Sequence, residues 1–148
     1  MPMVAAGYHL TYASGYTYNN DPRFAAIWEK SSTAPWVARH GLTSAQYQSA
    51  FNTYTAQGYR PRFVNGYTVS NSARFVAYWD KSPAPAGGWV ARHGITSAQY
   101  QSEFNNWLAQ GFRLVHISGY QDAGQARYAA LWEKSATAAP ACFCRAGR

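Results

Sequence analysis

Two six-residue segments combine side chains that could bind a ligand. The sequence Trp-Val-Ala-Arg-His-Gly begins at Trp36 and again at Trp89. A Trp offers a flat apolar face with a polar edge, which suits a sugar ring, and an Arg can pair with a carboxylate. A His can act as a base or a metal ligand near neutral pH. The candidate ligand-binding residues are therefore Trp36, Arg39, His40, Trp89, Arg92 and His93.

Catalysis by His40 or His93 would require further groups. A hydrolase of this kind needs a Ser or Cys nucleophile and an acid that orients the histidine. The sequence has no Gly-x-Ser-x-Gly motif, and Cys142 and Cys144 both lie close to the C-terminus. Because the motif recurs, a structural role is favoured, in which each His bonds a backbone carbonyl and fixes the turn into a helix. We therefore expect no catalytic residue and place a small hydrolase last among three functional hypotheses.

Metal binding has no support in the spacing of the possible ligands. The four histidines show no His-x-x-x-His pattern, and the two cysteines are separated by a single residue. Structural and catalytic zinc sites use more closely defined spacings. We therefore expect neither a metal site nor a cofactor.

The two candidate sets belong to a longer repeat that occurs three times. The pair Gly-Tyr begins at positions 15, 66 and 119, and each pair precedes an Arg-aromatic segment that ends in Trp, an acidic residue and Lys. The offset is 51 (66 minus 15) and then 53 (119 minus 66). The two extra residues fall in the linker 82–88, which we expect on the surface. A fixed period near this length indicates a repeat architecture.

Local chemistry predicts one helix in each of the two later units. Thr43 followed by Gln46 forms a capping box, and Thr-Ser-Ala-Gln returns at position 96. Tyr47, Phe51 and Tyr54 share one helical face, and Gly58 and the equivalent Gly111 suit the left-handed position that ends a helix. We therefore predict helices near 43–57 and 96–110.

The segments after each helix are typical of β-hairpins. Aromatic and β-branched residues fill 59–67 and 112–120, followed by a polar turn and a returning strand with alternating residue types. The predicted order is hairpin, helix, hairpin, helix, hairpin, an α+β repeat fold whose units share a core by stacking. The strands end in three Trp residues that we expect in that core, Trp28, Trp79 and Trp132. An open array and a closed ring both satisfy this pattern.

The predicted domain organisation is a single repeat domain over 1–135, with units of about 8–35, 36–88 and 89–135. The segment 136–148 contains Ala, Pro, Cys, Gly and Arg but neither a helix cap nor the repeated motif, so we expect a disordered tail.

Several motifs together resemble a known module. Trp-Val-Ala-Arg-His-Gly, Thr-Ser-Ala-Gln-Tyr and Gln-Gly-Tyr-Arg resemble the bacterial tandem repeat domain, which also occurs in the N-terminal region of fungal polyglycine hydrolases. The resemblance covers about residues 8–135 and implies a β/α repeat of secreted or surface proteins. The chemistry of those hydrolases belongs to a separate serine β-lactamase-like domain with a Ser-x-x-Lys motif. No Ser-x-x-Lys occurs here, so the resemblance implies the accessory module and assigns no role to a single residue.

The charges favour structural pairs over a nucleic-acid surface. The net charge is +7, with ten Arg and three Lys spread through the repeats rather than clustered. We therefore expect no nucleic-acid partner. Each strand-end Trp is followed by an acid, and we expect these acids to pair with Arg39 or Arg92. The acids are Glu29, Asp80 and Glu133.

Composition favours an extracellular or cell-surface protein. Only 13% of residues are charged and 17% are aromatic. No run of 18 apolar residues predicts a membrane span, and Met1–Gly7 shows no signal peptide.

The leading functional hypothesis is a non-catalytic, lectin-like module that binds carbohydrate or cell-wall polymer through repeated Trp, Arg and His sites. The alternative is a self-assembling structural protein that forms homo-oligomers or filaments through its repeat ends.

Overall fold

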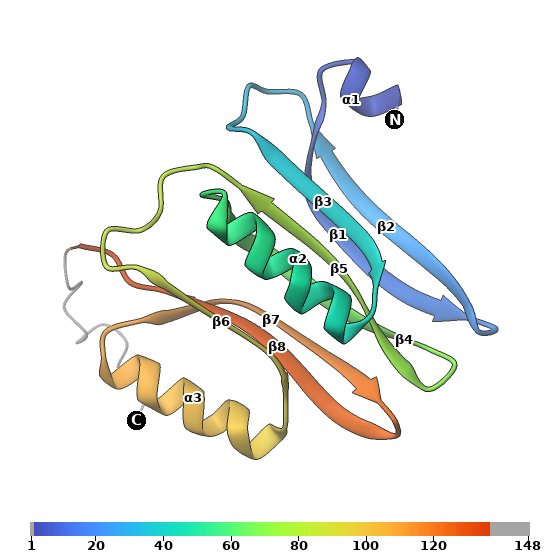
Figure 1. Cartoon of the computed structure of the whole chain (residues 1–148), viewed down its shortest axis with the longest axis vertical. Helices are drawn as coiled ribbons and strands as arrows, with labels where there is room; N and C mark the ends of the chain where they lie inside the picture. Colours follow the sequence, from blue (N-terminus) through green and yellow to red (C-terminus); the bar gives the residue numbers. More distant parts are fainter. Residues whose placement is uncertain (1, 137–148) are drawn as a thin grey trace, which may run out of the picture.

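Three small antiparallel sheets stack in series in the computed structural model, which describes residues 2–136 (Figure 1). The elements are, in chain order, α1 (Pro2–Ala5), β1 (His9–Tyr18), β2 (Asp21–Glu29), β3 (Trp36–Leu42), α2 (Ser44–Ala56), β4 (Arg60–Val69), β5 (Ser72–Asp80), β6 (Trp89–Ile95), α3 (Ser97–Ala109), β7 (Arg113–Asp122) and β8 (Gln125–Glu133). The strand orders are β1-β2, β3-β5-β4 and β6-β8-β7. The second and third repeats each consist of a strand, a helix and a hairpin.

The Trp-Val-Ala-Arg-His-Gly segments form strands β3 and β6, which the predicted order of hairpins and helices did not include. β4 pairs with one edge of β5 and β3 pairs with the other, which places Trp36 opposite Asp80. A register shift between Arg39 and Leu42 marks a β-bulge, after which Leu42 pairs with Phe75, and Gly41 in the bulge has φ +68°. The fold is therefore richer in β-structure than the predicted arrangement of three hairpins and two helices.

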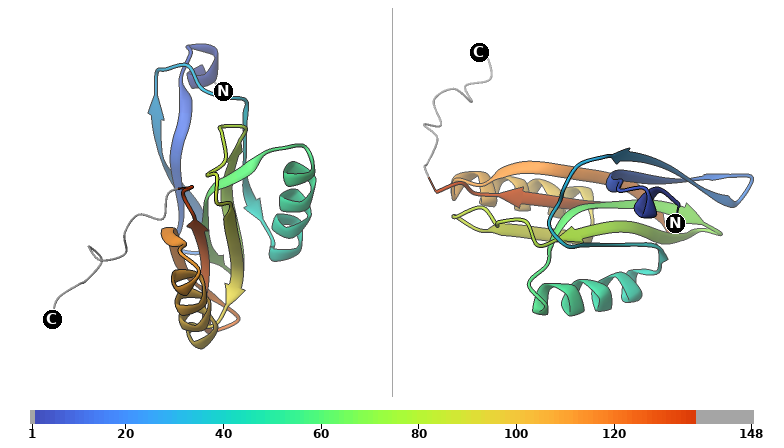
Figure 2. Two further views of the ribbon diagram at one scale, coloured as in Figure 1. Left: turned by 90° about the vertical axis from the view of Figure 1, so that its left-hand side faces the viewer. Right: turned by 90° about the horizontal axis from the view of Figure 1, so that it is seen from above.

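The two predicted helices are confirmed, with their caps. Thr43 and Thr96 each accept a hydrogen bond from the backbone N–H of the Gln three residues later, and each Gln side chain bonds back to the cap. Gly58 follows α2 at φ +86°, in the left-handed region that glycine adopts without strain. Both long helices run along the sheet of their own repeat (Figures 1 and 2).

The short helix α1, which the sequence did not predict, corresponds to the last turn of α2. The Ala6 amide donates to the Pro2 carbonyl at 3.1 Å, as Gln57 donates to Thr53 at 3.3 Å. Gly7 then adopts φ +85°. The first repeat therefore contains the end of the repeat helix and its hairpin.

The hairpins turn through pairs of residues with positive φ, at the polar segments that were predicted to be turns. Asn19 and Asn20 have φ of 50° and 59°, which suits the tight turn that matches strand twist. Ser70 and Asn71 repeat this conformation in the second hairpin.

The core lies at the junctions between repeats and beneath the helices. Trp79 and Trp132 are fully buried, as expected. Trp79 belongs to a cluster that α2 covers through Tyr47. A second cluster joins the first two sheets, with Leu10 on β1 packed near Phe63 on β4. Trp28, at the equivalent place in the first repeat, is only partly buried.

The array is open over the described residues, because the first and last sheets share no strand pairing within 2–136. No helix in that range is long and apolar enough to cross a membrane. The expected tail lies outside the described residues apart from its first position, as do Cys142 and Cys144.

Candidate functional site

The first predicted set lines an apolar groove between the first hairpin and β3 of the second repeat. Trp36 stacks on Tyr78, with ring centroids 5.5 Å apart and planes 25° apart. His40 lies edge-on to Phe24 at 5.0 Å. With Arg39 and Trp28 they border a cavity of about 270 Å³. The structure therefore brings Trp36, Arg39 and His40 together.

The second set lies against α2, where Arg92 and His93 border a cavity of about 350 Å³ together with side chains of that helix. Trp89 lies edge-on to Phe51 at 6.0 Å, and His93 lies edge-on to Tyr47 at 4.7 Å. Burial lowers the pKa of His93 below its ordinary value. Arg92 pairs instead with a residue of α3. The two sets therefore have different surroundings, although each borders a cavity.

The two sets have different surroundings because α2 covers the apolar face of the hairpin in the second repeat, whereas the equivalent face in the first repeat is open. Phe24 and Phe75 are equivalent residues, 51 positions apart. Phe24 is 43% exposed and Phe75 is 0% exposed, since Tyr47 of α2 packs on Phe75. In the first repeat α1 has only four residues, so the apolar face of β2 remains uncovered.

His93 lies near a hydroxyl but lacks the other partner that a hydrolase needs. Its Nε2 is 3.4 Å from Oγ of Ser44. Within 2–136 no ion pair joins His93 to a carboxylate. We expected His40 and His93 to bond a backbone carbonyl. A bond of this kind is instead made by His116, whose Nε2 lies 2.9 Å from the Val64 carbonyl oxygen.

The acids that follow the strand-end Trp residues do not pair with Arg39 or Arg92, so that prediction was wrong. Asp80 pairs with Arg62 at 2.9 Å. Glu133 pairs with Arg60 at 2.8 Å and so links the third repeat to the second. These two arginines lie at the start of β4, directly beside the ends of β5 and β8.

Arg39 and Arg92 instead lie against the helix of their own repeat. The Arg39 guanidinium is 5.5 Å from the Tyr54 ring centroid, and the Arg92 guanidinium is 5.5 Å from that of Trp107. Cation–π contacts of this kind stabilise both partners. Arg92 also donates from Nε to Oε1 of Glu103 at 3.1 Å.

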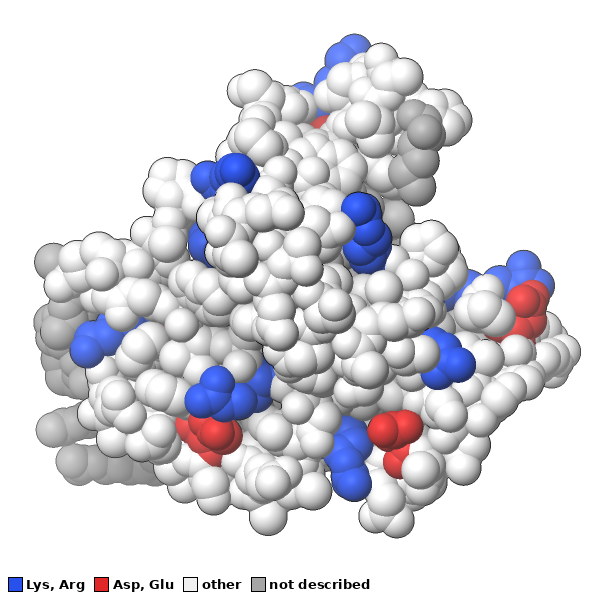
Figure 3. Space-filling model, viewed as in Figure 1, with Lys and Arg blue, Asp and Glu red and all other residues white. Residues whose placement is uncertain are grey.

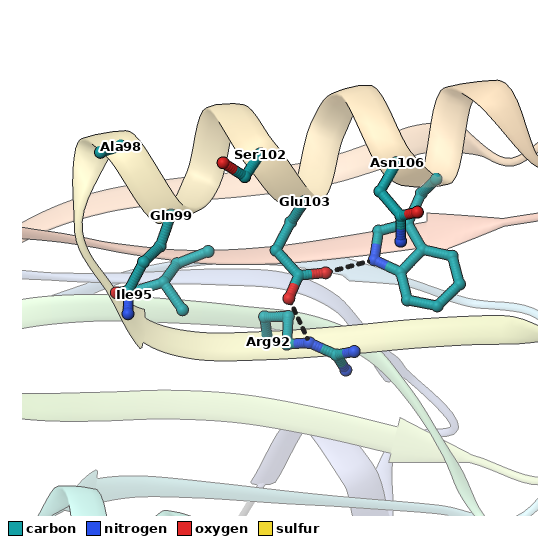
Figure 4. A pocket seen from close by; sticks show the side chains of 8 residues that line it. Arg92, Ile95, Ala98, Gln99, Ser102, Glu103 and Asn106 are labelled. Carbon is teal, nitrogen blue, oxygen red and sulfur yellow. Dashed lines mark hydrogen bonds and ion pairs between the residues drawn. The ribbon is translucent and has the colours of Figure 1, made fainter.

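That bond forms part of an open groove between β6 and α3 (Figure 4). Glu103 points from α3 toward Arg92 on β6, and its Oε2 accepts a hydrogen bond from Nε1 of Trp107. The groove has a volume of about 490 Å³ and is lined by Arg92, Ile95, Ala98, Gln99, Ser102, Glu103, Asn106 and Trp107.

The groove is polar but nearly neutral, because Arg92 and Glu103 compensate each other. Their side chains are partly exposed, and a guanidinium carries more N–H donors than its bonds to Glu103 and to the Ala91 carbonyl use. A hydroxyl of Ser102 and an amide of Asn106 border the same space. Such a surface suits hydroxyl groups better than phosphate.

Sequence reasoning found Arg92 but missed its neighbours. The signal was the divergence between two otherwise similar helices. Glu103, Asn106 and Trp107 take the places of Ala50, Thr53 and Tyr54. The second repeat therefore has the arginine over the aromatic ring but lacks the carboxylate between them.

The repeated strand, helix and hairpin agree with a comparison against protein-family models. The model described as a polyglycine hydrolase-like structural repeat matches residues 3–31, 33–82 and 86–135. The chain belongs to this family. In this structural repeat family member, the second and third matches each span a strand, a helix and a hairpin, whereas the first spans most of α1 and a hairpin.

Charged groups are dispersed over the structural repeats. On the face in Figure 3, Lys and Arg side chains appear singly, and several lie beside acids. In the described part of the chain no group of three His, Cys, Asp or Glu residues gathers as metal ligands.

Proposed function

We propose that this protein is a non-catalytic binding module for a neutral, hydroxyl-rich polymer, most simply a carbohydrate or cell-wall polysaccharide, outside the cell. The groove between β6 and α3 is its binding site. The observation that supports this proposal is the bridge from Glu103 to both Arg92 and Trp107, which holds donors, acceptors and an indole at one open surface.

The groove matches the two faces of a sugar ring. Ile95 and Trp107 supply apolar surface for its C–H groups. Arg92, Ser102 and Asn106 supply donors and acceptors for its hydroxyls. Because the Arg92 charge is already paired, the same groove has little attraction for a polyanion.

The second repeat provides substitutions that the fold already tolerates. The triple variant Glu103→Ala, Asn106→Thr, Trp107→Tyr gives the third repeat the residues of the second. We expect it to weaken retention on insoluble β-glucan, chitin or cellulose about tenfold, or about 1.4 kcal/mol, with unchanged circular dichroism. Affinity electrophoresis in soluble glucan measures the same effect.

The matched control changes the second repeat in the opposite direction. Ala50→Glu with Tyr54→Trp places the bridge beside Arg39, and we expect tighter retention because a polymer then meets two sites. Absence of retention of the unmodified chain on every neutral polysaccharide would contradict the proposal, as would equal retention of the triple variant.

A further inference from the structure

Each junction between repeats uses a tyrosine that lies over a glycine of the preceding repeat. Tyr67 on β4 lies over Gly15 on β1, and Tyr120 on β7 lies over Gly66 on β4. A Cβ atom at either glycine would overlap the ring. The strands can therefore approach closely only because these positions have no side chain.

Hydrogen bonds repeat at the same two junctions. Thr17 donates through Oγ1 to the Thr68 carbonyl, and Thr68 donates through Oγ1 to the Gln121 carbonyl at 2.6 Å. These residues are 51 and 53 positions apart (68 minus 17, 121 minus 68). The second junction thus repeats the glycine, tyrosine and threonine contacts of the first, and it adds the ion pair of Arg60 with Glu133.

The two ends of the array carry the unused halves of this junction. On the first repeat Tyr16 is 52% exposed, whereas its equivalent Tyr67 is 5% exposed. On the third repeat Ile117 is 43% exposed, whereas its equivalent Val64 is 0% exposed. Gly119 is equivalent to Gly15 and Gly66, and the nearest atom to a Cβ at Gly119 belongs to Tyr128 of its own hairpin, at 3.4 Å.

Within residues 2–136, the exposed large hydrophobic side chains also belong to the repeats at the two ends of the array. The large hydrophobic side chains that remain exposed all belong to the first and third repeats: Val4, Tyr12, Tyr16, Tyr18, Phe24, Ile27, Leu108, Val115 and Ile117. The middle repeat, which has a neighbour on each side, contributes none of them. An exposed apolar end that matches an existing interface is a site for a further copy of that interface.

We propose that a second copy of this chain docks head to tail, with β1 of one copy packed on β7 of the other. Tyr16 of one copy then lies over Gly119 of the second, and the first hairpin covers Ile117, as Tyr120 of β7 and Ala129 of β8 pack in the cluster of Val64 within one chain. The first and third sheets lie at opposite ends of the array (Figure 1), so both surfaces are accessible in one molecule. The interface is heterologous, and such interfaces continue into rings or filaments.

The first test is the mass of the 16.4 kDa chain by light scattering and sedimentation velocity over a hundredfold dilution. We expect a mass that exceeds the monomer and rises with concentration. Tyr16→Ala and Ile117→Asp should each shift the association to at least tenfold higher concentration. Both side chains are exposed in the single chain, so circular dichroism should not change.

Two further variants control for general loss of apolar surface. Phe24→Ala and Leu108→Asp alter exposed residues of the same two repeats. Phe24 faces His40 and Leu108 is on α3, so both lie outside the proposed junction. We expect them to associate like the unmodified chain. Equal weakening by these controls would overturn the assigned register.

A mixing experiment tests the head-to-tail arrangement itself. The Tyr16→Ala chain retains an intact β7 surface, and the Ile117→Asp chain retains an intact β1 surface. An equimolar mixture should therefore form a heterodimer under conditions where neither variant associates alone. A mixture that stays monomeric would overturn the proposal, as would a constant monomer mass of the unmodified chain at every concentration.

Discussion

The ring of Tyr120 occupies the space where a side chain at Gly66 would lie. Gly66→Ala would force the ring or the strand to move, and overpacking of this kind costs about 1–3 kcal/mol. We expect that loss in the free energy of unfolding, measured by urea denaturation. Gly119→Ala is the matched control, because its Cβ would make an ordinary contact with Tyr128. Equal losses in the two variants would show that the junction is not the cause.

Phe24 and Phe75 provide a second comparison between equivalent positions. Phe75 is enclosed by Tyr47, His93 and Tyr120, so Phe75→Ala should reduce the free energy of unfolding by about 3–5 kcal/mol. Phe24→Ala removes a partly exposed ring and should cost about 1 kcal/mol or less. Urea denaturation of both variants measures the difference. A large loss for Phe24→Ala would mean that the groove is closed in solution.

Stability should fall at alkaline pH because of buried tyrosines. Burial raises the pKa of Tyr120 to about 12 and also raises that of Tyr47. Above pH 10 an unfolded tyrosine ionises while the folded one stays protonated, so this stability is complete below pH 10 and declines from 10 to 12. Thermal melts across that range should show the decline, and Tyr120→Phe should make it shallower, with Tyr47 retaining part of it.

The same Tyr120→Phe variant has a cost at neutral pH. The Gly94 amide donates to the Tyr120 hydroxyl at 2.8 Å, and loss of that acceptor should destabilise the fold by about 1 kcal/mol. An unchanged unfolding midpoint at pH 7 would contradict this expectation, whatever the alkaline result.

Two histidines should make the fold weaker in acid. Burial lowers the pKa of His93 and of His116, where a bond to the Val64 carbonyl partly opposes it. The unfolded chain therefore binds more protons below about pH 6.5, so the contribution is present above that pH and lost as the pH falls. His93→Phe keeps a ring between Tyr47 and Phe75 and should reduce the difference between melting temperatures at pH 7.5 and 5. If the difference between the two melting temperatures does not change, His93 is not the source of the acid sensitivity.

The arrangement of the candidate sites shows where sequence reasoning was sufficient. Arg39 and Arg92 were identified from the repeated motif, and both lie beside helix aromatics. The six residues lie in two different surroundings, because α2 packs on Trp89 and His93 while Trp36 and His40 border an open groove. Whether a residue is buried depends on the neighbouring repeat, which identical local sequences do not reveal.

The sequence by itself determined the two long helices, the hairpins and the number of repeats. Capping boxes, positive-φ turns and helix-ending glycines act over two to four residues, so their chemistry is complete within the local segment. Only the tertiary structure decided that Trp36–Leu42 is a strand, because its partner β5 begins 30 residues later (72 minus 42). The same holds for Arg60 and Glu133, which are 73 residues apart, and for the open surfaces at the two ends. Pairing and burial are properties of neighbours in space, so equivalent residues such as Tyr16 and Tyr67 have different exposures where one neighbouring repeat is missing.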